Sequence, residues 1–95
     1  MNMFKVNEYF DGKVKSIGYE NAEGRQTVGV MAKGEYEFGT STVEYMTVVS
    51  GSMDVQLPGE KSWKTYKPFE TFVVAKDVKF KVKMSEDTTY KCIYK

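Results

Sequence analysis

Hydrophobic residues alternate with polar residues in short runs along most of the chain. The clearest run is residues 78–84, where Val, Phe, Val and Met occupy every second position and lysines occupy the three positions between them. A period of two places the apolar side chains on one face of a β-strand and the lysines on the other. We interpret the lysine row as a solvated face that guards a sheet edge, with a phosphate-binding row as the alternative.

Seven further segments show the same alternation and predict additional strands. They are residues 14–17, 27–31, 36–38, 44–49, 53–57, 72–75 and 89–94. Turn residues separate them at intervals of roughly 8–12 residues, which is typical of a sandwich or a barrel. No amphipathic helical pattern is longer than about two turns. The sequence therefore predicts an all-β protein in which residues 1–95 form a single domain.

Composition narrows the classes of function. The chain has 14 basic and 13 acidic residues, and this near balance argues against a nucleic-acid-binding protein, which normally carries a basic patch. No stretch approaches about 18 apolar residues, so we expect a cytoplasmic protein without a membrane partner. The single cysteine, Cys92, excludes an internal disulfide and fits a reducing compartment. A chain of 95 residues builds a thin core, which favours association, and we expect a homodimer.

The reactive side chains exclude several chemistries. The chain has no histidine, so a histidine-based triad, an imidazole base and an ordinary zinc site are all excluded. No phosphate-binding loop motif is present, and the spacing of the carboxylates does not suggest an oxygen-only metal site. The remaining carboxylates, single arginine, hydroxyls and aromatic rings suit a site that binds a sugar, stacks on a base and holds an anion. Such a site works by positioning reactants and stabilising charge.

Two segments resemble the conserved motifs of the cupins. The first is GEYEFGTSTVEYMTVVSGSMDV at residues 34–55, where Glu44, six intervening residues and Gly51 match the second half of the first motif. The histidine pair of that motif is absent. The second is KPFETFVVA at residues 67–75, where Phe72 stands in place of the motif's histidine. The resemblance implies a single-domain, RmlC-like cupin β-barrel or jelly roll that lacks all three imidazole ligands of the metal-binding cupins.

Three longer segments are similar to one family of short cupins. They are NEYFDGKVKSIG at residues 7–18, VGVMAKGEYEFGT at residues 28–40 and EYMTVVSG at residues 44–51. The family is that of the broad-specificity pyrimidine/purine nucleoside phosphorylases, which this chain resembles over nearly its whole length. The resemblance implies an enzyme that cleaves diverse nucleosides with phosphate to give free base and pentose 1-phosphate. It also implies that no metal or other cofactor is needed. Inorganic phosphate would be a co-substrate and not a cofactor.

Two other functions remain open on the same fold. A cupin module that binds a small metabolite without turning it over would also lack the metal ligands. A sugar isomerase or epimerase is a third reading, although it would normally need a histidine or a metal.

Phosphorolysis assigns roles to the charged candidates. Arg25 can hold phosphate through its planar guanidinium group, which offers two parallel hydrogen bonds. The matching family region also has an arginine after a turn glycine. The alternative is that Arg25 is an exposed residue of a hairpin turn. Lys13 could add a second positive charge. In metal cupins the residue equivalent to Glu44 points into the barrel, where a carboxylate could bind ribose hydroxyls and stabilise a positively charged sugar. The alternative for Glu44 is a structural carboxylate paired with a lysine or a tyrosine. Arg25 and Glu44 are the two catalytic candidates.

The remaining candidates would contact the substrate. Met46 faces inward beside Glu44 if the period of two is kept. Ser16 and Thr40 could donate hydrogen bonds, although a local turn or cross-strand role is favoured for each. A set of aromatic residues could stack on the base, although for each one taken alone a core position is favoured: Phe10, Tyr36, Phe38, Phe72, Tyr90 and Tyr94. Cys92 alternates with two of these tyrosines and reads as an inward core position, not as a nucleophile.

Overall fold

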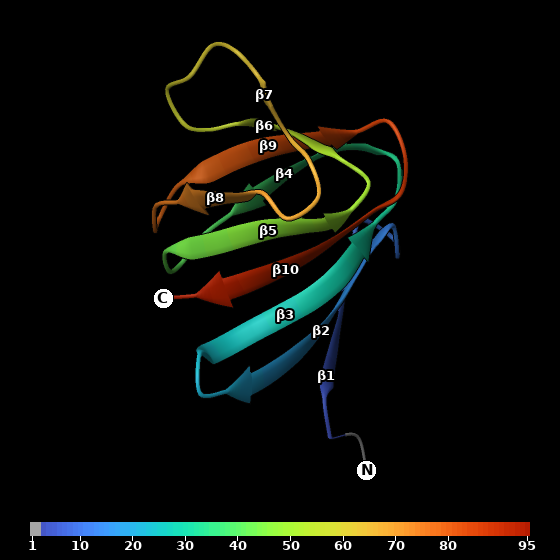
Figure 1. Ribbon diagram of the computed structural model, residues 1–95, viewed down its shortest axis with the longest axis vertical. Coiled ribbons are helices and arrows are strands. Elements are labelled where there is room, and N and C mark those ends of the chain that lie inside the picture. The colour runs from blue at the N-terminus through green and yellow to red at the C-terminus, as the bar shows by residue number, and fades with distance from the viewer. Residues whose placement is uncertain (1–2) are drawn as a thin grey trace.

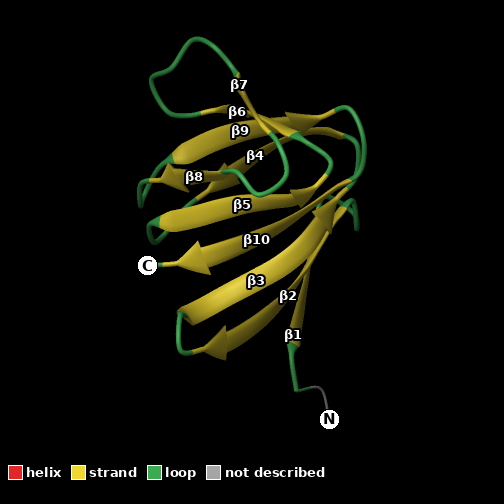
Figure 2. Ribbon diagram, viewed as in Figure 1, coloured by secondary structure: helices red, strands yellow, loops and turns green. Residues whose placement is uncertain are grey.

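Strand pairing divides the chain into two antiparallel sheets (Figures 1 and 2). The computed structural model describes residues 3–95. Six strands form the larger sheet in the order β1-β2-β3-β10-β5-β8, and four form the smaller sheet in the order β4-β9-β6-β7. The strands are β1 (Lys5–Tyr9), β2 (Val14–Asn21), β3 (Gly24–Met31), β4 (Gly34–Gly39), β5 (Glu44–Ser50), β6 (Met53–Gln56), β7 (Lys64–Tyr66), β8 (Thr71–Val74), β9 (Lys79–Met84) and β10 (Thr88–Tyr94).

The all-β prediction is confirmed, and each of the eight predicted strands is present within a few residues of its expected bounds. Two strands, β1 and β7, were not predicted. The part of the chain that the structure describes contains no helix, and therefore none that is long and apolar enough to cross a membrane.

The lysine row on β9 lies on the outer face of the smaller sheet. Phe80, Val82 and Met84 are buried, whereas Lys79 and Lys81 are exposed. The prediction of a solvated lysine face is therefore confirmed, but its role at a sheet edge is wrong. Strand β9 lies between β4 and β6, and its Lys81 and Lys83 pair with Glu37 and Glu35 of β4 in the ladder.

The core fills the space between the two sheets. Alternate residues of β5, β9 and β10 point into it, as the period of two requires. The buried apolar residues are Val14, Met31, Tyr36, Met46, Val48, Met53, Val55, Phe72, Val74, Phe80, Val82, Met84, Tyr90 and Cys92.

The unequal size of the sheets exposes part of this inner face. The smaller sheet lies opposite β5, β8 and β10, whereas β1, β2 and the start of β3 continue beyond it (Figure 1). The molecule is accordingly elongated, with extents of 44 × 25 × 24 Å. The inner face of β2, β3 and β10 is therefore accessible from the side on which the smaller sheet ends.

Candidate active site

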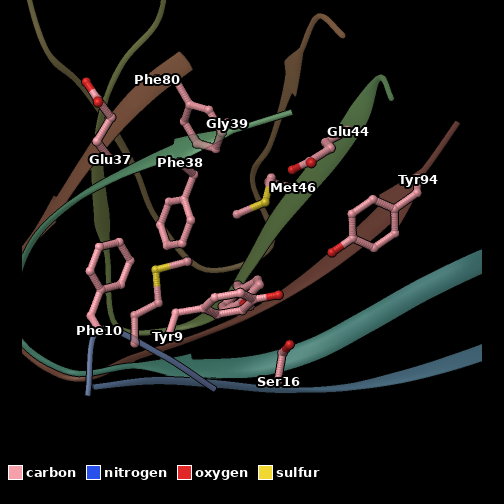
Figure 3. Close-up of a pocket in the computed structure, with 12 residues that line it drawn as sticks. Tyr9, Phe10, Ser16, Glu37, Phe38, Gly39, Glu44, Met46, Phe80 and Tyr94 are labelled. Carbon is pink, nitrogen blue, oxygen red and sulfur yellow. The ribbon is translucent and has the colours of Figure 1, made fainter. Parts of the chain in front are cut away.

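A cavity of about 480 Å³ opens between the two sheets (Figure 3). Its walls come from β2, β3, β5 and β10 of the larger sheet, from β4 and β9 of the smaller sheet, and from the end of β1 with the turn that follows it. The lining residues are Tyr9, Phe10, Ser16, Met31, Glu37, Phe38, Gly39, Glu44, Met46, Phe80, Tyr90 and Tyr94. One end of the cavity is polar, and the other is aromatic.

Glu44 supplies the carboxylate at the polar end. It is the first residue of β5, it is half-buried, and Figure 3 shows its carboxylate directed into the cavity near Met46. Its Oε1 accepts a hydrogen bond from the Sγ of Cys92, on the neighbouring β10, at 3.6 Å. Burial raises the pKa of Glu44, and the bond from Cys92 offsets this only in part. Burial and the charge of Glu44 raise the pKa of the Cys92 thiol, so the thiol stays protonated and donates.

Tyr90 and Ser16 are buried and add two hydroxyl groups to the wall of the same cavity. Burial raises the pKa of Tyr90 to about 12, although the neighbouring Ser16 hydroxyl acts in the opposite direction, so the phenol is neutral at physiological pH. The two residues lie on either side of Gly29 of β3. A Cβ on Gly29 would lie 2.9 Å from the Tyr90 hydroxyl and 2.9 Å from the Ser16 Cβ. The absence of a side chain at Gly29 therefore allows the phenol to reach across β3.

Tyr94 closes the polar end. Its hydroxyl lies 3.0 Å from the Oγ1 of Thr27 on β3. Burial raises the pKa of Tyr94, and the bond to Thr27 offsets part of this rise. The polar end thus presents the carboxyl group of Glu44 among neutral hydroxyl and thiol groups, most of which can donate a hydrogen bond.

Phe10 forms the aromatic end together with Phe38 and Phe80. The ring of Phe10 lies 5.6 Å from that of Phe38 at an interplanar angle of 86°. The backbone that holds it is strained, because Phe10 has a φ of 53° and Asp11 a φ of 57°, in the left-handed region. Gly12 completes this tight turn, with its N–H donating to the Tyr9 carbonyl at 3.2 Å. The turn after β1 therefore directs an aromatic side chain toward the cavity.

Seven of the predicted site residues line this cavity: Phe10, Ser16, Phe38, Glu44, Met46, Tyr90 and Tyr94. The period of two along β5 and β10 correctly predicted that four of them face inward. Five cavity residues were not predicted: Tyr9, Met31, Glu37, Gly39 and Phe80. Phe80 lies on the inner face of a predicted strand, so the alternation contained a signal for it. Glu37 lies at the rim, with its carboxylate turned away (Figure 3).

Three predicted substrate-binding residues have structural roles. Tyr36 is buried in the core, and its hydroxyl donates to the Ala32 carbonyl at 2.7 Å. Phe72 is also buried, with its ring 4.8 Å from that of Tyr66. The hydroxyl of Thr40 donates to the Ala75 carbonyl at 2.7 Å, which ties the end of β4 to the loop after β8. The hydroxyls of Tyr36 and Thr40 are therefore already bonded within the protein, and the ring of Phe72 packs in the core.

The two predicted anion-binding residues are far from each other. Lys13 is exposed in the turn before β2, next to the Val14–Met31 pair. Arg25 pairs with Glu20 at the opposite end of the β2–β3 ladder, and six residues of strand separate the two ends by about 20 Å. The structure does not bring Lys13 and Arg25 together, and neither of them lines the cavity.

The side chains around the cavity do not fit a divalent metal ion. Glu44 is bonded to a protonated thiol, and Phe72 provides a buried ring where other cupins carry a histidine. Among residues 3–95 no group of three or more Asp, Glu, Cys or His side chains is arranged to hold a metal. Zinc and other divalent metal sites usually require three or more such ligands.

The chain is similar in sequence and in structure to known proteins. The family described as pyrimidine/purine nucleoside phosphorylase matches residues 4–94. A protein of that name from Pseudomonas putida is 58% identical over 93 residues, covering 98% of this chain and 99% of the relative. A protein of unknown function from Vibrio parahaemolyticus superimposes with a TM-score of 0.92 at 42% identity, covering 96% and 97% of the two chains.

A more distant likeness concerns the fold alone. An RmlC-like cupin from Shewanella frigidimarina superimposes with a TM-score of 0.71 at 15% identity, covering 95% of this chain and 81% of that one. Together with the two stacked antiparallel sheets, this likeness confirms the prediction of a cupin fold. With a family match that spans almost every residue, the chain belongs to the pyrimidine/purine nucleoside phosphorylase family.

Proposed function

We propose that this protein is a pentosyltransferase that cleaves nucleosides with phosphate. The observation that carries the proposal is a cavity with one half-buried carboxylate, Glu44, at a polar end and a cluster of aromatic rings at the other, in a chain of this family. In the reaction a phosphate oxygen bonds to C1′ while the bond from C1′ to the base nitrogen breaks. The base keeps the electron pair of that bond and takes up the proton that phosphate gives up, so the products are free base and pentose 1-phosphate.

The polar end suits the sugar. As the bond to the base breaks, positive charge develops on the pentose ring, and the carboxylate of Glu44 stabilises that charge. Its ground-state role is to accept hydrogen bonds from the sugar hydroxyls, which compensates for its partial removal from water. The neutral hydroxyls of Ser16, Tyr90 and Tyr94 can each donate to or accept from the same hydroxyls.

The aromatic end suits the base. Phe10, Phe38 and Phe80 offer flat apolar surface on which a purine or a pyrimidine can stack. Strong selectivity arises when buried polar groups of a site demand particular partners on the substrate. The rings offer none, which supports cleavage of both classes of nucleoside.

The proposed reaction uses no metal or other cofactor. Support comes from the donor set of the cavity, where the only carboxylate directed inward among the described residues is paired with a thiol. Charge stabilisation by Glu44 and correct positioning of the two substrates supply the catalysis instead.

A binding module that does not turn over its ligand is the second candidate, since the same cavity could hold a nucleoside without cleaving it. One experiment separates the two. Release of free base is measured from a panel of purine and pyrimidine nucleosides, with and without phosphate, after treatment with a chelator. We expect release of uracil and adenine that requires phosphate and survives the chelator. Binding without release from any nucleoside would contradict the proposed reaction and leave the binding module.

We further propose that the protein is a homodimer, formed through the outer face of the larger sheet. Five aliphatic side chains of that face are between 41% and 63% exposed: Val6, Ile17, Val28, Val30 and Val49. They surround an almost wholly apolar hollow of about 500 Å³. A second copy can cover this face with the same patch about a two-fold axis, which would bury apolar surface that a chain of 95 residues cannot bury internally. A cytoplasmic location fits the free thiol of Cys92.

A further inference from the structure

A second hollow lies beside the cavity on the same inner face of the larger sheet. Its volume is about 450 Å³, and it lies where β1, β2 and β3 extend beyond the smaller sheet. Tyr94 lines both the hollow and the cavity, so the two spaces meet at its ring. A reaction between two substrates needs two neighbouring sites, and here two neighbouring spaces share a wall.

Arg25 brings a positive charge into this hollow that no carboxylate neutralises at close range. Its guanidinium carbon lies 5.5 Å from the centroid of the Tyr94 ring, so the group is held by stacking against the shared wall. Among the described residues one ion pair lies within 4.0 Å, between Lys15 and Glu8, and it does not involve Arg25. The guanidinium therefore keeps its hydrogen-bond donors available for another anion.

Lys5 of β1 lines the same hollow and adds a second positive charge. Lys5 pairs with Gly18 and Arg25 pairs with Glu20, so the two cations lie on adjacent rows of the sheet. Lys5 and Arg25 contribute +2 and Glu20 contributes −1, which leaves a net +1 from the charged side chains that line the hollow.

The boundary between the two spaces is built from hydrogen-bonded pairs. The side-chain amide of Asn7 donates to the Ser16 hydroxyl at 3.2 Å, and the hydroxyls of Thr27 and Tyr94 lie 3.0 Å apart. In the second pair one hydroxyl donates and the other accepts. The accepting hydroxyl therefore keeps its own proton and can donate to a ligand at the point where the spaces meet.

We propose that this hollow binds inorganic phosphate next to the nucleoside, with Arg25 and Lys5 as its cations and Tyr94 at the point where the two substrates meet. The proposal rests on phosphorolysis as the proposed function and assigns its second substrate to a site of its own. The fork of Arg25 holds two phosphate oxygens, and the ammonium of Lys5 supplies a point charge. Lys5 thus takes the role that the sequence assigned to Lys13.

The test measures phosphate binding directly, by calorimetric titration of inorganic phosphate in the absence of nucleoside. Arg25→Ala should weaken binding about 10- to 100-fold, because it removes charge-assisted hydrogen bonds. Arg25→Lys should restore only part of the affinity, because lysine has no planar fork. Lys5→Ala should weaken binding by a smaller factor. Lys81→Ala, an exposed lysine on the outer face of the smaller sheet, is the matched control and should leave the affinity unchanged.

Steady-state kinetics provide the second readout. Arg25→Ala should raise the KM for phosphate and leave the KM for the nucleoside within about twofold, because the cations do not line the cavity. Unchanged phosphate affinity in Arg25→Ala, or a loss of affinity in Lys13→Ala without one in Lys5→Ala, would overturn the proposal. Phosphate binding that depends on Arg25 in a protein that releases no base would uphold this site and refute phosphorolysis. Failure of the proposed phosphate site can therefore be distinguished from failure of the proposed reaction.

Discussion

Glu44 is a carboxylate whose protein partner is a weak donor. The thiol of Cys92 contributes less than a hydroxyl or an ammonium group would, and burial therefore dominates and raises the pKa of Glu44 above its ordinary value near 4.5. In the pH range above that value the native state binds more protons than the unfolded state. The free energy of unfolding contributed by this group therefore decreases as pH rises from the ordinary value through the raised one. A bound sugar that donates hydrogen bonds to the Glu44 carboxylate would offset this decrease in the free energy of unfolding.

Replacement of this carboxylate should separate activity from stability. Glu44→Gln should lower kcat roughly 100-fold or more, as expected when a group that stabilises transition-state charge is removed. It should also abolish the contribution of this group to the decrease in stability above pH 4.5. The free energy of unfolding of the variant should therefore increase relative to that of the wild type as pH rises toward 7. Urea unfolding at several pH values, together with base-release kinetics, measures both effects. Glu35→Gln, the same change at an exposed glutamate of β4, is the control. If the free energy of unfolding depends on pH in the same way in the wild type and in Glu44→Gln, the raised pKa of Glu44 is refuted.

The strained turn after β1 allows a second test at the residue scale. Phe10 and Asp11 both have positive φ, which costs about 1–3 kcal/mol per residue. Asp11→Gly should relieve the backbone strain at this position and raise the free energy of unfolding by about 1 kcal/mol. Activity should stay unchanged, because Asp11 does not line the cavity. Phe10→Gly relieves the same strain but loses its ring contacts, and the KM for nucleosides should rise about tenfold if the ring stacks on the base. Thermal unfolding and kinetics of the two variants measure these effects. An unchanged KM in Phe10→Gly would show that the ring is purely structural.

At the scale of the elements, the period of two determined which strands could be predicted. Each of the eight predicted strands has buried residues on one face, and that burial produces the alternation in the sequence. Strand β1 pairs only with β2 and has no fully buried residue, so it shows no such pattern. Strand β7 has three residues, too few for a period to be visible.

The same limit explains which parts of the site could be predicted. Glu44, Met46, Tyr90 and Tyr94 follow from inward alternation on strands that were recognised. The separation of Lys13 from Arg25 depends on the register between β2 and β3, which the alternation of neither strand encodes. Lys5 lies on the unpredicted β1, so the hollow that it shares with Arg25 could not be found from the sequence.

Gly29 gives a test of how β2, β3 and β10 pack together. A Cβ at this position would lie 2.5 Å from the Lys15 carbonyl oxygen, a backbone atom that cannot move independently. Gly29→Ala should therefore lower the free energy of unfolding by about 1–3 kcal/mol. Gly18→Ala on the adjacent strand is the control, because its Cβ would meet nothing closer than 3.8 Å. Chemical denaturation of both variants measures the difference. Equal stability of the two would show that the strands separate without cost.

At the scale of the whole molecule, the exposed apolar face of the larger sheet determines the expected assembly. The wild type should have twice the 10.9 kDa mass of the chain in solution. Val28→Glu places a charge at the centre of that face and should shift the dimer toward monomer, raising the dimer dissociation constant at least about tenfold. Phe69→Glu, at a more exposed apolar residue outside the patch, should leave the mass unchanged. Light scattering over a range of concentrations measures both. A wild type that is monomeric at high concentration would refute the proposed dimer.

The position of β10 in the larger sheet has a consequence for how the chain acquires its structure during synthesis. It comes last of the ten strands along the described residues, yet it lies between β3 and β5 and joins them. While the ribosome is still making the preceding strands, β3 and β5 each present an unpaired edge to their surroundings. Glu44 also lacks the thiol that will bond to it until β10 emerges. The nascent chain therefore passes through an interval in which its sheet is open and vulnerable to association with other chains.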